Sequence, residues 1–477
     1  MRFIFGIFSL LPCLLFAQNS VLSEGNWYKL GITQAGIHKI TAQNLRDLGI
    51  DLAQINPQKI AIYGNGGGML PQANNIARYQ DLQENAIWVV GEQDGRFDDT
   101  DYILFYAQNA DKWSFDEPNN RFVFEKNVYS DKNYYFLTIK NSNALRIQNR
   151  SSVGGASQNV TIFDDYLSHE EDSKNVLSQE GKGGSGREWY GEFFNGSNQV
   201  DINQEVEGIV PNTPLLFTSS VLSQAFSNTS FQVSLNGYAF ATQTLPPIVD
   251  ATYSSKGIAS TEVYTLNSNQ IPNLPQLNVN YTYSQQGLGV RAYLNYFRIQ
   301  CQRYLRLYNN QTRFRSLKSL ETSISNFIVE NTNSDTKIWD ITNPLVAENQ
   351  EFSLSSSQAT FGANTEILRE FVVWQGNDFP SPELLGSVGN QNLRALNTAN
   401  LIIITHPDFR SEAERLADFR RSNDGLSVLV VDIFQIYNEF SSGKQDVSAI
   451  RDFVRHLYLK NTSETKYLLL FGATSFD

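Results

Sequence analysis

The stretch Leu401-Ile-Ile-Ile-Thr405 is an unbroken apolar run that ends in a threonine, close to the end of this 477-residue chain. Runs of this kind are typical of parallel strands whose two faces are both covered. Residues 409–421 follow with alanine, leucine and phenylalanine at helical spacing, and Asn423-Asp424-Gly425 is a turn signal that ends the pattern. The stretch therefore predicts a buried strand followed by an amphipathic helix.

The same alternation continues towards the end of the chain. Val428-Leu-Val-Val431 and Tyr467-Leu-Leu-Leu-Phe471 predict two more buried strands, and residues 446–459 between them predict a second helix with Asp446 as its N-cap. Strands and helices that alternate with short connections predict a right-handed parallel α/β sheet. Three strands are only half of such a domain, and half a sheet is expected to expose an apolar edge.

The carboxyl ends of parallel strands are where ligands and catalytic groups usually lie in open α/β sheets. His406, Asp432 and residues 472–477 follow the three predicted strands. These residues mark the expected place of a site, although Pro407 also suggests a turn role for His406. They contain no credible nucleophile and base, so the sequence predicts a scaffold for chemistry without catalytic residues, and the 477-residue chain is expected to be inert.

Motifs in and before this region resemble the opening of the gingipain family of cysteine peptidases, in particular the sortases of the type IX secretion system of Bacteroidetes. The motifs are Asn390-Gln-Asn-Leu-Arg394, Tyr437-Asn-Glu-Phe-Ser-Ser-Gly443, Gln445-Asp446, Ser448-Ala-Ile-Arg-Asp452 and Leu468-Leu-Leu-Phe-Gly472, with Ser185-Gly-Arg-Glu-Trp-Tyr-Gly-Glu192 and Trp339-Asp-Ile-Thr-Asn-Pro344 upstream. The likeness extends over most of the chain after the first twenty residues.

The resemblance implies a caspase-like α/β domain with a Cys–His dyad. It also implies the removal of C-terminal sorting signals from secreted cargo proteins, the attachment of the cargo to a surface glycolipid, and association with outer-membrane components of type IX secretion. The dyad of the family lies after the third strand, so none of its residues is carried over. The family usually has Gly-Asp at this point, where this chain has Gly472-Ala473.

Composition and the amino terminus agree with an exported protein. Arg2 and the apolar residues 3–16 predict a signal peptide over residues 1–17; a lipoprotein signal at Cys13 is the alternative. The net charge of −12 argues against a nucleic-acid partner. Aromatic residues are 12% of the chain and charged residues only 18%, which favours β-structure outside the cell.

Residues 18–140 predict a mixed α+β domain. The glycine-rich loop at residues 64–68 follows a predicted strand but no helix follows it, so a tight turn is expected in place of a phosphate site. Asp94, Asp98 and Asp101 lie between two predicted strands and offer oxygen ligands for Ca²⁺. The alternative is an acidic hairpin in which these side chains bond their own turn, and no cofactor is required.

Polar residues 141–186 predict a linker followed by an acidic and glycine-rich loop, and residues 187–390 predict a β-sandwich with a hairpin turn at Asn236-Gly237. Residues 391–477 are the incomplete α/β domain. A sandwich of this composition suits a carbohydrate-binding or adhesin module equally well. The alternative to an enzyme is therefore a secreted adhesin or docking protein with a degenerate α/β tail.

The remaining titratable residues predict structural roles. Cys301 is the only cysteine after the signal peptide and alternates onto one face of a predicted strand, which indicates a buried thiol and no internal disulfide. His38 and His456 are expected on packed or exposed surfaces. His169 has acidic neighbours; a solvated acidic loop is preferred there, and a metal site is the alternative.

Overall fold

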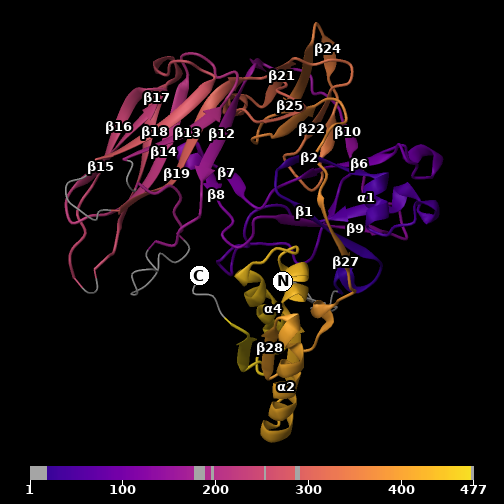
Figure 1. Cartoon of the computed structure of the whole chain (residues 1–477). Helices are drawn as coiled ribbons and strands as arrows, with labels where there is room; N and C mark the ends of the chain where they lie inside the picture. Colours follow the sequence, from indigo (N-terminus) through magenta and orange to yellow (C-terminus); the bar gives the residue numbers. More distant parts are fainter. Residues whose placement is uncertain (1–18, 177–187, 195–197, 252–253, 285–290, 474–477) are drawn as a thin grey trace, which may run out of the picture.

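The computed structural model describes residues 19–176, 188–194, 198–251, 254–284 and 291–473. The predicted signal peptide at residues 1–17 and the last four residues of the expected site lie outside them. Three β-rich modules form most of the molecule, and a C-terminal α/β module projects from them (Figure 1). Among the described residues, no helix combines the length and the apolar character that crossing a lipid bilayer requires.

The first module, from residue 19 to about residue 140, packs two sheets and a short helix around one core that includes Ile40, Leu45 and Ile103. Its five-stranded sheet has the order β27-β1-β9-β3-β4. The strands of the two sheets and the helix are β1 (Trp27–Ile32), β3 (Ile60–Tyr63), β4 (Glu84–Asn85), β9 (Asn133–Ile139), β27 (Glu383–Val388), β2 (Gly36–Thr41), β5 (Trp88–Val90), β6 (Tyr102–Ala107) and α1 (Ala42–Asp47). Strand β27 comes from far downstream, so this module closes only after the chain has passed through the next two.

The second module is the predicted sandwich. Its sheets have the orders β12-β19-β14-β17 and β13-β18-β15-β16 and enclose a core that includes Phe217, Tyr281 and Phe297. The strands are β12 (Ile162–Glu170), β13 (Gln199–Glu205), β14 (Pro214–Gln224), β15 (Thr229–Leu235), β16 (Tyr238–Leu245), β17 (Ile258–Asn267), β18 (Gln276–Ser284) and β19 (Arg291–Tyr304). Asn236 and Gly237 both have positive φ, at 49° and 80°, as the predicted hairpin turn requires.

The third module is a further pair of sheets, with the orders β10-β23-β22-β26-β20 and β11-β21-β25-β24, around Phe314, Phe327 and Phe371. Its strands are β10 (Gln148–Arg150), β11 (Gln158–Val160), β20 (Gln311–Phe314), β21 (Ile324–Glu330), β22 (Lys337–Asp340), β23 (Glu348–Gln350), β24 (Ser353–Ser355), β25 (Gln358–Asn364) and β26 (Phe371–Trp374). A separate hairpin, β7 (Lys112–Asp116) and β8 (Arg121–Glu125), hydrogen-bonds to the second module through Gln300.

Two of the predicted boundaries are wrong. The linker expected over residues 141–186 contains β10, β11 and β12, and the single sandwich expected over residues 187–390 is two modules plus β27. β10 and β11 are short and polar, and their parallel partners β23 and β21 lie more than 160 residues downstream. No local pattern can show such a pairing. The glycine-rich part of the predicted loop, residues 180–186, lies outside the described residues.

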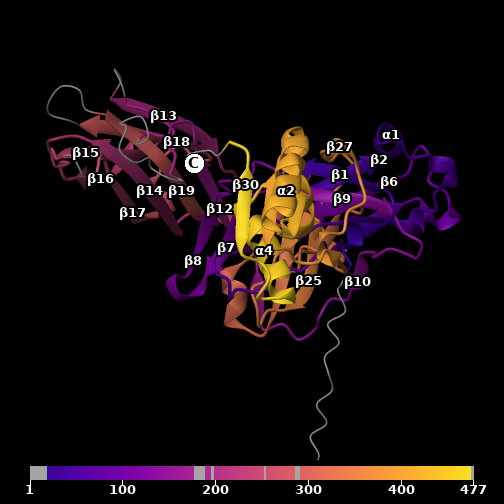
Figure 2. The same ribbon diagram turned by 90° about the horizontal axis from the view of Figure 1, so that it is seen from below.

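The α/β module has the predicted parallel sheet, with β28 (Leu401–Thr405) between β29 (Val428–Asp432) and β30 (Tyr467–Phe471). Helix α2 (Arg410–Asp424) covers one face, and α3 (Ile433–Phe440) and α4 (Val447–Lys460) cover the other. Figure 2 shows α2 over the sheet with β30 at its outer edge. The β-rich fold class that ends in an α/β sheet is therefore confirmed. Helix α3 was not predicted; it begins directly after Asp432, the last residue of β29, with no connecting loop.

Candidate functional site

The carboxyl edge of the α/β sheet brings the three strand ends together. Thr405 lies in register with Asp432 on one side and with Phe471 on the other. The Thr405 hydroxyl donates to the Phe471 carbonyl at 3.3 Å, which ties the central strand to β30. The three strand ends therefore meet at one edge of the sheet, which is the arrangement that the alternating strands and helices of the sequence predicted.

The polar groups at this edge are occupied with local structure. His406 Nδ1 accepts the Asp408 N–H at 3.2 Å and caps the 3-10 helix Pro407–Phe409. Asp432 Oδ1 accepts the Phe434 N–H at 2.7 Å and caps α3. The ring of Phe434 lies edge-on to His406 and, like Phe409, is about half exposed. His406 therefore has the turn role that Pro407 suggested. Among the described residues, this edge exposes aromatic rings but no cysteine that could act as a nucleophile.

Cys301 is the buried strand cysteine that the sequence predicted. It lies in β19 opposite Asp165 and is a free thiol. Burial, with a smaller contribution from the Asp165 charge, raises the pKa of this thiol far above its ordinary value. Among the described residues, no hydrogen bond joins Cys301 to a histidine. A thiol kept protonated and without a base is not a nucleophile.

Two of the three carboxylates predicted for calcium, those of Asp94 and Asp101, bond the backbone nearby. Asp94 Oδ1 accepts the Arg96 N–H at 2.9 Å, and Asp101 Oδ2 accepts the Asp98 N–H at 2.8 Å. The described residues bring three ligand atoms within 4.8 Å of one another at a different place, and Asp94, Asp98 and Asp101 do not form such a group. These bonds are those of the acidic hairpin, and calcium binding here stays a prediction.

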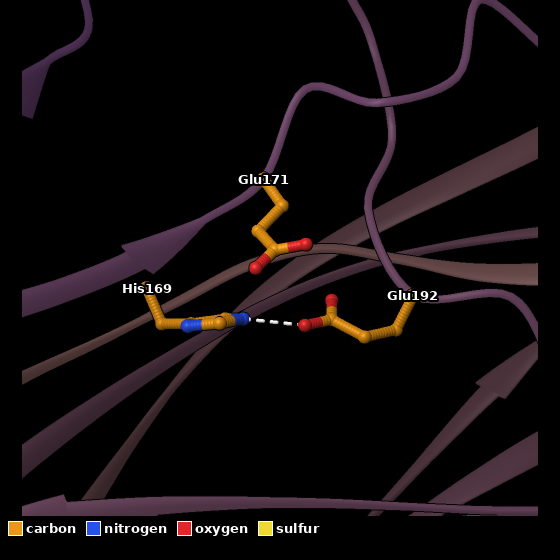
Figure 3. A group of neighbouring side chains, drawn as sticks. All are labelled: His169, Glu171 and Glu192. Atoms are coloured by element: carbon orange, nitrogen blue, oxygen red, sulfur yellow. Dashed lines mark hydrogen bonds and ion pairs between the residues drawn. The ribbon is translucent and has the colours of Figure 1, made fainter.

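The group that does converge contains His169, Glu171 and Glu192 (Figure 3). The solvated acidic loop preferred for His169 is wrong, because the residue lies in β12 with its ring stacked on Phe297 at 5.1 Å. Its Nε2 lies 2.5 Å from Glu192 Oε1. Glu192 is 23 residues further along the chain, and the only sequence signal was the mixture of histidine and glutamates around residue 170.

The glycine-rich loop of the first module forms hydrogen bonds with the α/β module. Lys444, between α3 and α4, donates from Nζ to the Gly66 carbonyl at 2.8 Å and to Asn133 Oδ1 at 3.1 Å. Asn65 N–H donates to Ser442 Oγ at 3.2 Å. A Cβ at Gly67 would lie 2.4 Å from the Asn109 carbonyl, so only glycine allows the loop to pack this closely. The loop is the predicted tight turn, and its exposed backbone serves as a set of hydrogen-bond partners.

Charged groups at this contact are deeply buried. Burial lowers the pKa of Lys444 to about 8 and that of Lys29 to about 8, and Lys29 Nζ donates to the Gly443 carbonyl at 2.9 Å. Glu439 accepts the Leu393 N–H at 2.8 Å and the Gln391 amide at 3.0 Å. Burial raises the pKa of Glu439, although these hydrogen bonds oppose the rise. We call this contact the docking face; it comprises Lys29, Lys444, Glu439, Asp446, Asp452, Arg78 and Arg394 with the loop 64–70.

An ion pair and a cap complete the docking face. Arg78 Nη1 donates to both oxygens of Asp452 at 2.9 Å, and both side chains are more than nine-tenths buried. Asp446 caps α4 through the Ser448 N–H and accepts the Leu70 N–H at 2.8 Å through its other oxygen. Bidentate and fully satisfied buried pairs have strict geometry. The docking face therefore fixes the direction in which the carboxyl edge of the α/β sheet points.

Comparison with known proteins agrees with this architecture. Residues 394–477 match the model of peptidase family C25, a family of cysteine peptidases. The crystal structure of dimeric latent PorU from Porphyromonas gingivalis has a TM-score of 0.81 to this chain at 23% identity, and the match covers 94% of this chain and 42% of that one. The chain thus spans less than half the length of PorU.

A second solved structure, the CBM36-1 domain of a xylanase from the hindgut metagenome of Trinervitermes trinervoides, covers 29% of the chain at 15% identity with a TM-score of 0.18, too low to carry an argument. No curated protein matches. The resemblance to gingipain-type cysteine peptidases is confirmed by two findings: the α/β module matches the C25 family model over residues 394–477, and the chain has a fold similar to that of PorU.

Proposed function

We propose that this chain positions a C25-type cysteine peptidase domain at the cell surface, and that the domain acts as a sortase. The complete enzyme would remove C-terminal sorting signals from cargo of the type IX secretion system and attach the cargo to a surface glycolipid, next to outer-membrane components of that system. The observation that carries the proposal is the coincidence of the C25 match with a PorU-like arrangement of nearly the whole chain.

The chemistry of such an enzyme is attack on a peptide carbonyl by a thiolate that a neighbouring histidine activates, with backbone N–H groups holding the oxyanion. The described residues supply the support for it. The docking face holds β28, β29 and β30 with their carboxyl ends at one exposed edge, where Phe409 and Phe434 lie beside His406. By itself the chain is proposed to be inert, because Cys301 is buried and His406 caps a turn.

The test compares two purified proteins: the 477-residue chain, and the product of the source gene that includes the codons after the one for Asp477. Each is incubated with a cargo protein that carries a C-terminal sorting signal and with a small amine in place of the glycolipid. Mass spectrometry follows the new carboxyl end. We expect cleavage and amine transfer only with the longer product, and loss of both when its newly encoded cysteine nucleophile is replaced by alanine.

The opposite results are equally clear. Cleavage by the 477-residue chain would show that it is not inert, and a stop codon after Asp477 would remove the enzyme interpretation in favour of a secreted docking protein or adhesin. Ala473 provides a graded readout, since it is exposed just after β30 where an aspartate is usual in the family. Ala473→Asp in the longer product is expected to preserve or raise the cleavage rate.

A further inference from the structure

Two segments of the second module converge on one small site that the proposed peptidase chemistry does not use. His169 lies near the end of β12, Glu171 follows that strand, and Glu192 lies on the segment 188–194 (Figure 3). Their nearest ligand atoms, an imidazole nitrogen and two carboxylate oxygens, all lie within 4.8 Å of one another. Atoms bound to one metal ion at about 2.0–2.2 Å have separations within this limit.

The supporting structure holds these side chains in place. The His169 ring is stacked on Phe297, with ring centroids 5.1 Å apart and an angle of 17° between the planes. The Glu192 carbonyl accepts the Leu294 N–H at 3.0 Å, which fixes the backbone of Glu192 to β19. A Cβ at Gly191 would lie 2.9 Å from the Glu171 carbonyl, so glycine at this position lets the two glutamate-bearing segments approach.

One oxygen of Glu192 has no partner. Oε1 meets His169 Nε2 at 2.5 Å, whereas Oε2 is buried from solvent and has no hydrogen bond. A carboxylate oxygen in this state costs free energy unless something binds it. The buried Oε2 of Glu192 is thus free to act as a ligand atom.

We propose that His169, Glu171 and Glu192 bind one zinc ion, with water in the fourth position. Imidazole is a ligand for zinc and other transition metals, whereas calcium and magnesium take oxygen ligands. One nitrogen and two carboxylate oxygens satisfy the zinc preference for a tetrahedral site with N and O ligands. The His169 imidazole would bind as the neutral base, so any proton on it is released to solvent when the metal binds.

The bound ion would tie the end of β12 to the segment 188–194. That segment has its own small core, in which Tyr190 and Phe193 pack against Tyr293 of β19. The role is structural: the metal would stabilise this side of the second module. Glu171 is exposed and leaves the fourth position open to water.

The test is zinc binding by the 477-residue chain after treatment with a chelator. Isothermal titration calorimetry is expected to give one site per chain, and Co²⁺ in place of zinc is expected to give the visible absorption of a four-coordinate site. His169→Gln and Glu192→Gln should each weaken binding at least tenfold. Asp172→Asn is the matched control, because it removes a neighbouring negative charge that pairs with Lys126 and is outside the group; its affinity should stay within about twofold of wild type.

A second readout separates binding from folding. Zinc at one hundred times the wild-type dissociation constant should raise the melting midpoint of the wild-type chain by a few degrees, and should raise that of Glu192→Gln by no more than about half as much. Far-UV circular dichroism without metal should be the same for all variants. The proposal is overturned if the wild-type chain does not bind zinc at 100 μM, or if the His169→Gln and Glu192→Gln variants bind as tightly as wild type; His169 and Glu192 would then form an ion pair only.

Discussion

The two sides of the α/β module are built in opposite ways. The docking face buries charged groups, and each has partners in the first module or in the residues just before β28: Lys444 with Gly66 and Asn133, and Glu439 with Gln391 and Leu393. The outer strand β30 instead exposes Tyr467, Leu468 and Leu470, each to about half of its surface.

The difference shows which side of the α/β module fixes its orientation relative to the first module. A buried charge that loses its partner costs several kcal/mol, so the docking face specifies one orientation and tolerates little change. An exposed apolar edge specifies no orientation and is free to contact another chain. The exposed edge expected from three strands is confirmed. Three predictions test this difference. They are given in order of expected effect, from a buried charge on the docking face to the exposed side chains of β30.

Removal of the Glu439 carboxylate is expected to have the largest effect. Glu439→Ala removes the acceptor of the Leu393 N–H and one of the two acceptors of the Gln391 amide, the other being the Gln435 carbonyl. The buried Arg394 keeps its bond to the main-chain carbonyl of residue 439, and Asp81, at 3.7 Å, remains as the carboxylate beside it. We expect a loss of about 3–5 kcal/mol in the free energy of unfolding of this module. Urea unfolding followed at 222 nm reports on it, because α2, α3 and α4 are the longest helices among the described residues.

The matched control is Glu412→Ala on α2. Glu412 pairs with Arg415 at 2.6 Å, but its side chain is 51% exposed. Exposed pairs of this kind contribute about 0.2–1 kcal/mol at most. Equal losses for the two variants would contradict the contrast between the docking face and the exposed surface.

The second prediction concerns pH. Lys444 has a pKa of about 8 in the folded chain, against about 10.4 for an unfolded lysine. Between these values the unfolded state binds more protons, so the contribution of Lys444 to stability is lowest below pH 8 and rises as the pH increases towards 10. The expected rise is about 2 kcal/mol at most between pH 8 and pH 10.

Lys444→Met isolates this contribution. The variant loses the hydrogen bonds to Gly66 and Asn133 at every pH, which is a constant difference, but it cannot titrate. The unfolding free energy of wild type minus that of Lys444→Met should therefore increase from pH 8 to pH 10. A flat or falling difference would mean that Lys444 is not held in the buried environment described. Lys29 has a pKa lowered by burial in the same direction.

The same contrast explains what the sequence could predict. The strands β28 and β30 were predicted to the residue, and Asp446 was correctly predicted as the cap of α4, because apolar runs and caps are local signals. The partners of Lys444 lie 378 and 311 residues away, and no local pattern marks them. The glycine-rich loop could be predicted as a turn, but not as the contact for a module that follows it by nearly the whole length of the chain.

In the β-rich modules and at the proposed zinc site, too, local features could be predicted from the sequence and contacts between distant residues could not. The sandwich strands were predicted where apolar and polar residues alternate, whereas β10 and β11 were missed because they are polar edge strands paired across long separations. The ligand types at residues 169–171 were visible in the sequence. Their convergence with Glu192 was not, since it depends on the packing of the segment 188–194 against β19.

The smallest effect is expected at β30. Leu468 and Leu470 are 46% and 47% exposed, whereas Leu469 packs against the core cluster on the α2 face of the sheet, which includes Ala413 and Ala417. The double change Leu468→Thr and Leu470→Thr keeps side chains suited to a strand and should alter the free energy of unfolding by no more than about 0.5 kcal/mol.

The same double change should lower self-association, measured by light scattering at increasing protein concentration, because it removes apolar surface from an unpaired strand edge. Leu469→Thr is the matched control and should cost about 1–3 kcal/mol, since it removes packing against α2. If the double variant were as unstable as Leu469→Thr, the outer face of β30 would be part of the packed module, and the contrast between a specified docking face and an open edge would fail. If stability is retained and association falls, the exposed side chains of β30 provide apolar contact surface and do not contribute to the packing of the described module.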